Sequence, residues 1–142
     1  MLSDNQLAQS LTAEMYRLVK ILRREAQSGA LLSLTERAVL SRLHPDKELL
    51  SGELAAREKV STQAMSQITG HLLDLGLITR TPSGEDRRKF LISLTDAGRS
   101  LVTERQQAKY EWLAQAIHDR LTDAEKRILS EAIPLLTKLA ST

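Results

Sequence analysis

Four basic side chains and two acidic ones lie close together in this 142-residue chain, around one short polar loop. The basic residues are Arg80, Arg87, Arg88 and Lys89. Such cations bind phosphate, and an arginine also suits a narrow DNA minor groove, where negative potential is concentrated. Arg88 is our candidate for a minor groove, and the other three are candidates for phosphate contacts. Asp86 is expected to brace an arginine and to fix the shape of the loop.

A second group of polar side chains lies in residues 61–75, which have helical periodicity. The side chains at the start of a helix reach base edges in the major groove of DNA. The candidates for such contacts are Ser61, Thr62, Gln63, Ser66 and Gln67, with His71 as a candidate for a phosphate. Taken alone, either group is compatible with an ordinary solvated surface. Because the loop follows the helix directly, the two together favour nucleic-acid binding.

The composition argues against catalysis, metals and cofactors. The chain has no cysteine, and its three histidines, His44, His71 and His118, have neither metal-ligand nor triad spacing. We therefore expect no enzymatic activity and no cofactor. The absence of cysteine fits a reducing cytoplasm, and neither a secretory signal nor a membrane span is expected. The net charge of +2 is a mild bias, so nucleic-acid binding would depend on locally placed charge.

The loop is expected to be the tip of a β-hairpin. Runs of β type, residues 77–81 and 89–94, flank it, and in the second run Phe90, Ile92 and Leu94 alternate at the strand period, although Leu91 breaks the polar face. Helical patterns come immediately before and after. The pattern therefore predicts a charged hairpin, residues 77–94, attached to a helical body.

The helices before the hairpin are expected to include a helix-turn-helix. A first helix is predicted from Ser3 to Ser28, stopped by Gly29, and Ser33 with Glu36 forms a capping-box signature for a short helix that ends near Leu43. The next helix opens at residue 51, and another spans residues 61–75 with an inward row. That row is Ala64, Ile68, Leu72 and Leu75. Residues 59–61 form the tight turn between these last two helices.

Two further helices are expected after the hairpin. Thr95 is the predicted N-cap of a helix from Asp96 to about Arg120, and Thr122 with Glu125 marks the start of the last one. Aliphatic stripes on the first and last helices predict helices that pack on helices.

The order of these elements resembles the multiple antibiotic resistance regulator (MarR) family of winged-helix transcription factors. The most specific segments are residues 86–88 (DRR) and 94–98 (LTDAG), which are similar to the family's D-x-R and L-T-x-x-G wing signature. Residues 76–80 (GLITR) are similar to its G-L-[IV]-x-R entry. The resemblance covers nearly the whole chain.

The resemblance implies a mainly α fold with a small hairpin wing, in one domain of residues 1–142. Residues 1–32 and 96–142 would form a helical dimerisation region, and residues 33–95 a winged helix-turn-helix lobe. A homodimer would bind an inverted repeat in double-stranded DNA, with the helix in the major groove and the wing arginine in the minor groove. We expect a repressor that is relieved by a small ligand. Candidates for the lining of the ligand site, and equally for the core, are Leu11, Met15, Tyr16, Leu32 and Trp112.

The chain departs from the family pattern in its reading helix. Family members commonly carry arginine at the positions that match Gln67 and His71, whereas residues 61–75 contain no lysine or arginine and one acid, Asp74. Residues 51–95 hold six basic and five acidic side chains, a net charge of +1. The helix is therefore expected to read bases through amides and hydroxyls, and glutamine favours adenine, so we expect an A·T-leaning site.

Two alternatives stay open from the sequence. A winged helix used only for protein contacts would explain the weakly basic reading helix. His44-Pro45-Asp46 resembles the tripeptide of J-domain cochaperones that stimulate heat-shock ATPases, although residues 51–75 lack the aromatic expected there. We interpret the tripeptide as a turn that stops the preceding helix.

Overall fold

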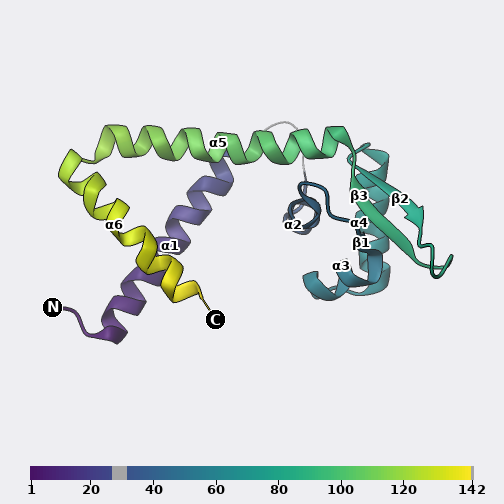
Figure 1. The fold of residues 1–142 in the computed structure, drawn as a ribbon, viewed down its shortest axis with the longest axis horizontal. Helices are drawn as coiled ribbons and strands as arrows, with labels where there is room; N and C mark the ends of the chain where they lie inside the picture. Colours follow the sequence, from purple (N-terminus) through teal and green to yellow (C-terminus); the bar gives the residue numbers. More distant parts are fainter. Residues whose placement is uncertain (27–31, 142) are drawn as a thin grey trace. The chain divides into compact units, whose positions relative to one another are not determined.

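The computed structural model describes residues 1–26 and 32–141, and these form six helices and a small sheet (Figure 1). The elements in chain order are α1 (Asp4–Glu25), α2 (Leu34–Leu43), β1 (Leu49–Leu50), α3 (Ser51–Glu58), α4 (Thr62–Asp74), β2 (Ile78–Pro82), β3 (Phe90–Leu94), α5 (Asp96–Arg120) and α6 (Asp123–Ala140). The predicted end of the first helix at Ser28 and Gly29 lies outside the described residues. The mainly α fold class is confirmed.

The chain divides into two compact units. One consists of Met1–Gln27 with Gln107–Thr142, and the other is Ser28–Gln106. The second unit contains every element from α2 to β3 and the first part of α5. The boundary between Gln106 and Gln107 lies near the middle of α5. The sequence predicts the corresponding boundary earlier, between residues 95 and 96.

Side-chain caps begin the helices where the sequence predicts them. The Ser33 hydroxyl accepts a hydrogen bond from the Glu36 amide, and the Glu36 carboxylate accepts one from the Ser33 amide. Thr122 and Glu125 make the same reciprocal pair at the start of α6. An N-cap of this kind stabilises a helix by about 1 kcal/mol.

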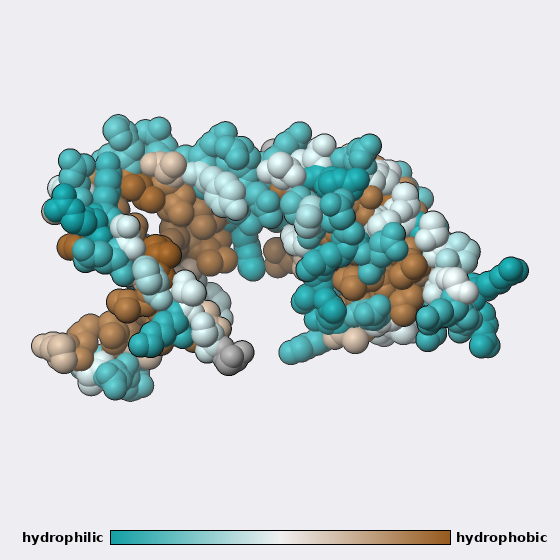
Figure 2. All heavy atoms as spheres, viewed as in Figure 1, coloured by the Kyte–Doolittle hydropathy of each residue, from teal (hydrophilic) through white to brown (hydrophobic). Residues whose placement is uncertain are grey.

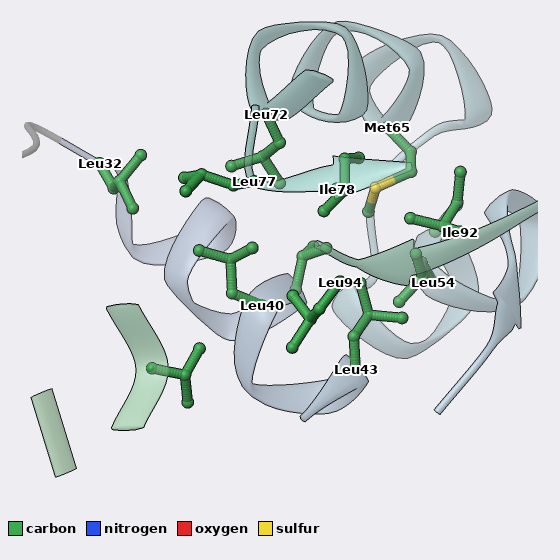
Figure 3. Packing of buried hydrophobic residues seen from close by; sticks show 13 residues of the cluster. Leu32, Leu40, Leu43, Leu54, Met65, Leu72, Leu77, Ile78, Ile92 and Leu94 are labelled. Atoms are coloured by element: carbon green, nitrogen blue, oxygen red, sulfur yellow. The ribbon is translucent and has the colours of Figure 1, made fainter. Parts of the chain in front are cut away.

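The core of the second unit is aliphatic and joins all its elements. In Figure 3, side chains from α2, α3, α4, β2 and β3 converge on one cluster. Its fully buried members are Val39, Leu40, Leu43, Leu54, Met65, Leu72 and Ile92. This cluster fixes α4 and the wing relative to each other, because both contribute to it.

The inward row of α4 differs from the predicted one. The buried residues are Met65, Thr69 and Leu72, while Ala64 and Ile68 are half-buried and Leu75 is exposed. Thr69 is tolerated in the core because its hydroxyl donates to the Met65 carbonyl oxygen at 2.9 Å. Because a threonine counts as polar in a periodicity analysis, the apolar pattern predicted the neighbouring row, which begins at Ala64.

The wing is a three-stranded sheet, whereas the sequence predicted a two-stranded hairpin. Its strand order is β1-β3-β2, and all pairs are antiparallel. The short strand β1 places Leu50 opposite Leu91 of β3. Leu91, which interrupts the alternation of the second run, therefore has a cross-strand neighbour of its own type.

A network of backbone contacts holds the base of the wing. The Thr95 hydroxyl donates to the Gly76 carbonyl oxygen at 2.7 Å and accepts from the Gly98 amide at 3.1 Å, while the Thr95 amide donates to the Leu77 carbonyl oxygen at 3.1 Å. A Cβ on Gly98 would lie 2.0 Å from that same Leu77 oxygen. The G-L-I and L-T-x-x-G segments thus join the end of α4, the wing and the start of α5.

The terminal helices expose their apolar stripes. Within the described chain, α1 and α6 contain no buried residue. Figure 2 shows apolar residues on the surface of this unit. Those more than half exposed include Leu7, Tyr16, Tyr110, Ile128, Ile133, Leu135 and Leu139. Such a set is large for a single chain in water and is typical of a protein–protein interface.

Candidate nucleic-acid interface

The turn that orients α4 has the predicted position and a left-handed residue. Lys59, the C-cap of α3, has φ 56° and ψ 43°, and the Val60 amide donates to the Ala55 carbonyl oxygen at 3.0 Å. Ser61 then caps α4, since its hydroxyl accepts from the Ala64 amide at 3.0 Å. Residues 59–61 therefore end one helix and start the next within three positions, which confirms the helix-turn-helix.

The predicted reading residues lie on the exposed side of α4. Ser61, Thr62, Gln63, Ser66, Gln67 and His71 are all exposed. Among the described residues, the side chains of Thr62, Gln63, Ser66 and Gln67 make no hydrogen bond within the protein. Their amide and hydroxyl groups are therefore available to an external donor or acceptor, as hydrogen bonding to base edges requires.

Asp86 organises the wing loop around Arg88. One Asp86 carboxylate oxygen accepts from the Arg88 amide at 3.0 Å and lies 3.4 Å from Arg88 Nε. The Lys89 amide donates to the Asp86 carbonyl oxygen at 3.0 Å. The Arg88 side chain is nevertheless 92% exposed, so most of its guanidinium hydrogen-bonding capacity faces solvent. Arg87 and Lys89 are also exposed.

Arg80 is held by the aromatic ring of Phe90, a contact that the sequence did not predict. Its guanidinium carbon lies 4.6 Å from the centre of the Phe90 ring, a cation–π contact. In the strand register Arg80 pairs with Ile92 and Pro82 with Phe90, so Arg80 and Phe90 are diagonal neighbours across β2 and β3. The hairpin register is the signal that would have identified this pair.

A groove of about 640 Å³ connects the reading helix with the wing. It is lined by Leu50, Ser51, Gly52, Glu53, Ala56, Thr62, Ser66, Thr69, Arg80, Arg88, Lys89 and Phe90. The structure thus brings together two predicted hydroxyl side chains of α4 and three predicted cations of the wing. Gln63, Gln67, His71 and Arg87 lie outside this lining. The start of α3 also borders the groove, which no pattern in the sequence indicated.

His71 is paired with a buried acid. Its Nδ1 contacts the Glu36 carboxylate, which is 6% exposed as a residue and lies in the first turn of α2. Burial raises the pKa of Glu36, but hydrogen bonds from Ser33 and His71 and the charge of His71 outweigh it and lower the pKa below the ordinary value. Glu36 is therefore ionised at neutral pH, which the capping-box pattern alone did not indicate.

Two arginines of the same unit have buried nitrogens with no partner. Arg37 Nε on α2, and Nε and Nη2 of Arg105 on α5, are inaccessible to solvent and make no hydrogen bond in the described structure. Burial lowers the pKa of Arg105, and the positive charge of Arg37 lowers it further. Both side chains are half-buried, so this arrangement places two positive charges near each other with part of their hydrogen-bonding capacity unused.

The His44-Pro45-Asp46 tripeptide ends α2, as predicted, with His44 as the C-cap. His44 Nε2 lies 3.3 Å from Thr103 Oγ1, and Asp46 Oδ1 lies 3.7 Å from Arg99 Nη1. Both partners belong to the first part of α5. The two side chains therefore have structural contacts within their own unit, which favours the interpretation as a turn.

The described residues contain no group of three or more side chains that would hold a metal ion. None of the helices in the same ranges is both long enough and apolar enough to cross a membrane.

The known proteins that this chain resembles are transcriptional regulators. The model of the MarR family matches residues 32–89. An HTH-type transcriptional regulator of Mycobacterium bovis is 33% identical over 137 residues, which cover 96% of this chain and 94% of the relative. The crystal structure of a transcriptional regulator from Pseudomonas aeruginosa has a TM-score of 0.83 at 31% identity, with 98% of this chain and 96% of that chain covered. FabT of Streptococcus pneumoniae, solved in complex with DNA, shares the fold with a TM-score of 0.66 at 16% identity and 96% coverage of both chains.

Proposed function

This chain belongs to the MarR family of DNA-binding transcription regulators, and from that premise we propose that it is a sequence-specific repressor that binds an inverted-repeat operator as a homodimer. The observation that carries the proposal is the shared groove, in which hydroxyl groups of α4 meet the cations of the wing. Its relatives are named transcriptional regulators, and we propose no enzymatic activity. Its place of action is the cytoplasm, with the DNA.

The two parts of the interface have different roles in this proposal. Ser61, Thr62, Gln63, Ser66 and Gln67 face base edges in the major groove, and they select sequence through neutral hydrogen bonds. Arg88 enters the adjacent minor groove, while Arg80, Arg87 and Lys89 contact phosphates. Because phosphate contacts provide most of the affinity and base contacts most of the specificity, the wing dominates binding strength and the helix dominates sequence choice.

The exposed apolar stripes of α1 and α6 support the homodimer. Ile128 and Leu139 are 67% and 73% exposed in the single chain, and a second copy offers the same surface for a symmetric contact. Burial of apolar area contributes roughly 25 cal/mol per Å². Two-fold symmetry then places the two reading helices on half-sites about one helical turn of DNA apart.

We propose that an anionic effector relieves repression, and the unpaired atoms of Arg37 and Arg105 support this. A carboxylate beside the two guanidinium groups would offset their mutual repulsion, and a movement of the side chains would let it accept hydrogen bonds from the nitrogens that are now closed to solvent. Arg105 lies on α5 and Arg37 on α2, the helix whose first turn contacts α4 through Glu36. Ligand binding at this pair is therefore connected to the reading helix by one side-chain contact.

Arg105→Gln should leave the unliganded protein at least as stable as the wild type, because it removes a half-buried positive charge that Arg37 repels. Benzoate at about 10 mM is expected to raise the melting temperature of the wild type by about 2 to 4 °C and to leave the variant unchanged. Differential scanning fluorimetry with inorganic phosphate and chloride as comparison anions makes the measurement. Equal shifts in both proteins would remove the anion site from these arginines.

Selection of DNA ligands by the purified protein tests the proposed function directly. Random duplexes are incubated with the protein at moderate salt, recovered and sequenced over several rounds. We expect an inverted repeat whose half-sites are about 10 base pairs apart and rich in A·T pairs. A population without any enriched repeat would contradict DNA recognition and favour the winged helix as a protein-contact module.

A further inference from the structure

The contact between His71 and Glu36 fixes the orientation of the histidine ring. Glu36 Oε1 accepts from the Ser33 amide at 2.9 Å, and Oε2 faces His71 Nδ1. Both oxygens of the carboxylate are thus occupied inside the protein. The His71 side chain remains 49% exposed, although one of its ring nitrogens faces a buried group.

The protonation state of Glu36 determines which atom of His71 donates inward. Hydrogen bonds hold the pKa of Glu36 below its ordinary value in spite of burial, so the group is a carboxylate and accepts only. His71 Nδ1 must therefore carry a hydrogen in this contact. The remaining nitrogen, Nε2, accepts a hydrogen bond when the ring is neutral and donates one when the ring is protonated.

Two charged side chains on the elements around α4 have partners other than His71. The elements packed on α4 include α2, α3 and β2. On α3, Glu58 pairs with Arg42, and on β2, Arg80 lies over Phe90. Asp74 follows one turn later on α4 itself. In the described structure, Glu36 is the ionisable group within ion-pair distance of His71.

We propose that Glu36 is a positioning residue for DNA binding, which holds His71 so that its protonated Nε2 donates to a backbone phosphate and makes operator affinity rise as the pH falls. This inference rests on the proposed DNA-binding function. A phosphate accepts a hydrogen bond from the imidazolium ring and not from the lone pair of the neutral one, so DNA binding takes up a proton at this position. The neutral ring presents the lone pair of Nε2 to the phosphate, and the negative phosphate oxygens repel that lone pair.

Operator binding by the full-length protein is measured by fluorescence anisotropy between about pH 5.5 and pH 8.5, the range in which imidazole changes charge. Wild-type affinity is expected to rise about tenfold toward low pH, with two such contacts per dimer. In His71→Gln this rise in operator affinity toward low pH should be absent. At low pH its slope of log affinity against log salt should be smaller by about 1.8, since about 0.9 is lost for each phosphate contact.

Glu36→Gln separates positioning from folding. Glutamine is accepted at this position of a capping box, so α2 keeps its N-cap while the carboxylate charge is removed. The pH dependence of operator affinity should become weaker, because the glutamine oxygen stays on the Ser33 amide and its NH2 group donates to Nδ1, which leaves a hydrogen on Nε2 even in the neutral ring. If this variant fails to fold, His71→Gln tests the inference alone, because its side chain lies at the surface.

His118→Gln is the matched control, because His118 is exposed on α5 outside the winged unit. It should keep the wild-type profile and salt slope. A wild-type profile in His71→Gln would overturn the inference, and an unchanged pH profile in folded Glu36→Gln would remove the role of Glu36. Absence of operator binding by the wild type at every pH would instead contradict the proposed function itself.

Discussion

Replacement of Arg88 by alanine is expected to weaken operator binding at least tenfold while the dimer stays intact, a loss of about 1.4 kcal/mol or more. Arg88 is 92% exposed, so its removal leaves no cavity in the protein. In the proposed complex each wing loses a guanidinium from a narrow minor groove, where an arginine is favoured over a more strongly hydrated cation. Fluorescence anisotropy gives the affinity, and sedimentation gives the oligomeric state.

Arg87→Ala is the matched control, since it removes the same charge from the adjacent, exposed position. It should cost only a few-fold in affinity, in keeping with a single screened phosphate contact. Asp86→Ala should weaken binding as well, because Arg88 loses the carboxylate that accepts from its amide and lies beside its Nε. A larger loss for Arg87 than for Arg88 would assign the minor-groove role to Arg87.

Gly98→Ala is expected to destabilise the protein by about 3 kcal/mol, the upper part of the usual range for overpacking. The added methyl carbon would lie 2.0 Å from the Leu77 carbonyl oxygen, which belongs to the backbone and cannot rotate away. Relief requires movement of α5 away from the base of the wing and loss of the Thr95 hydrogen bonds. Urea unfolding followed by circular dichroism measures the free energy.

Gly70→Ala provides the opposite case within the same fold. A Cβ at Gly70 meets no heavy atom within 4 Å, so tight packing does not explain this glycine in the middle of α4. Alanine should therefore stabilise the free protein by about 0.5 to 1 kcal/mol. If close approach of DNA explains the glycine, the same variant binds the operator more weakly. Equal destabilisation by both variants would refute the steric argument for Gly98.

Local signals in the sequence were sufficient for most of the secondary structure. The capping boxes at Ser33 and Thr122 identified helix starts, because the partners of an N-cap lie three residues away. The bounds of α5 agree with the prediction for the same reason. The wing was recognised from alternation, but β1 was missed, since two residues are too few to show a period. The core row of α4 was misassigned where a buried threonine bonds to its own helix.

The sequence by itself determined the types of the candidate binding side chains, their order and the family, because these depend on residue identity and short spacing. Only the tertiary structure decided which of them lie together. The groove unites α3, α4 and the wing, Phe90 holds Arg80, and Glu36 holds His71 across 35 positions of the chain. Such contacts arise when a shared core packs distant segments against each other, and no local pattern records which side chains will meet there.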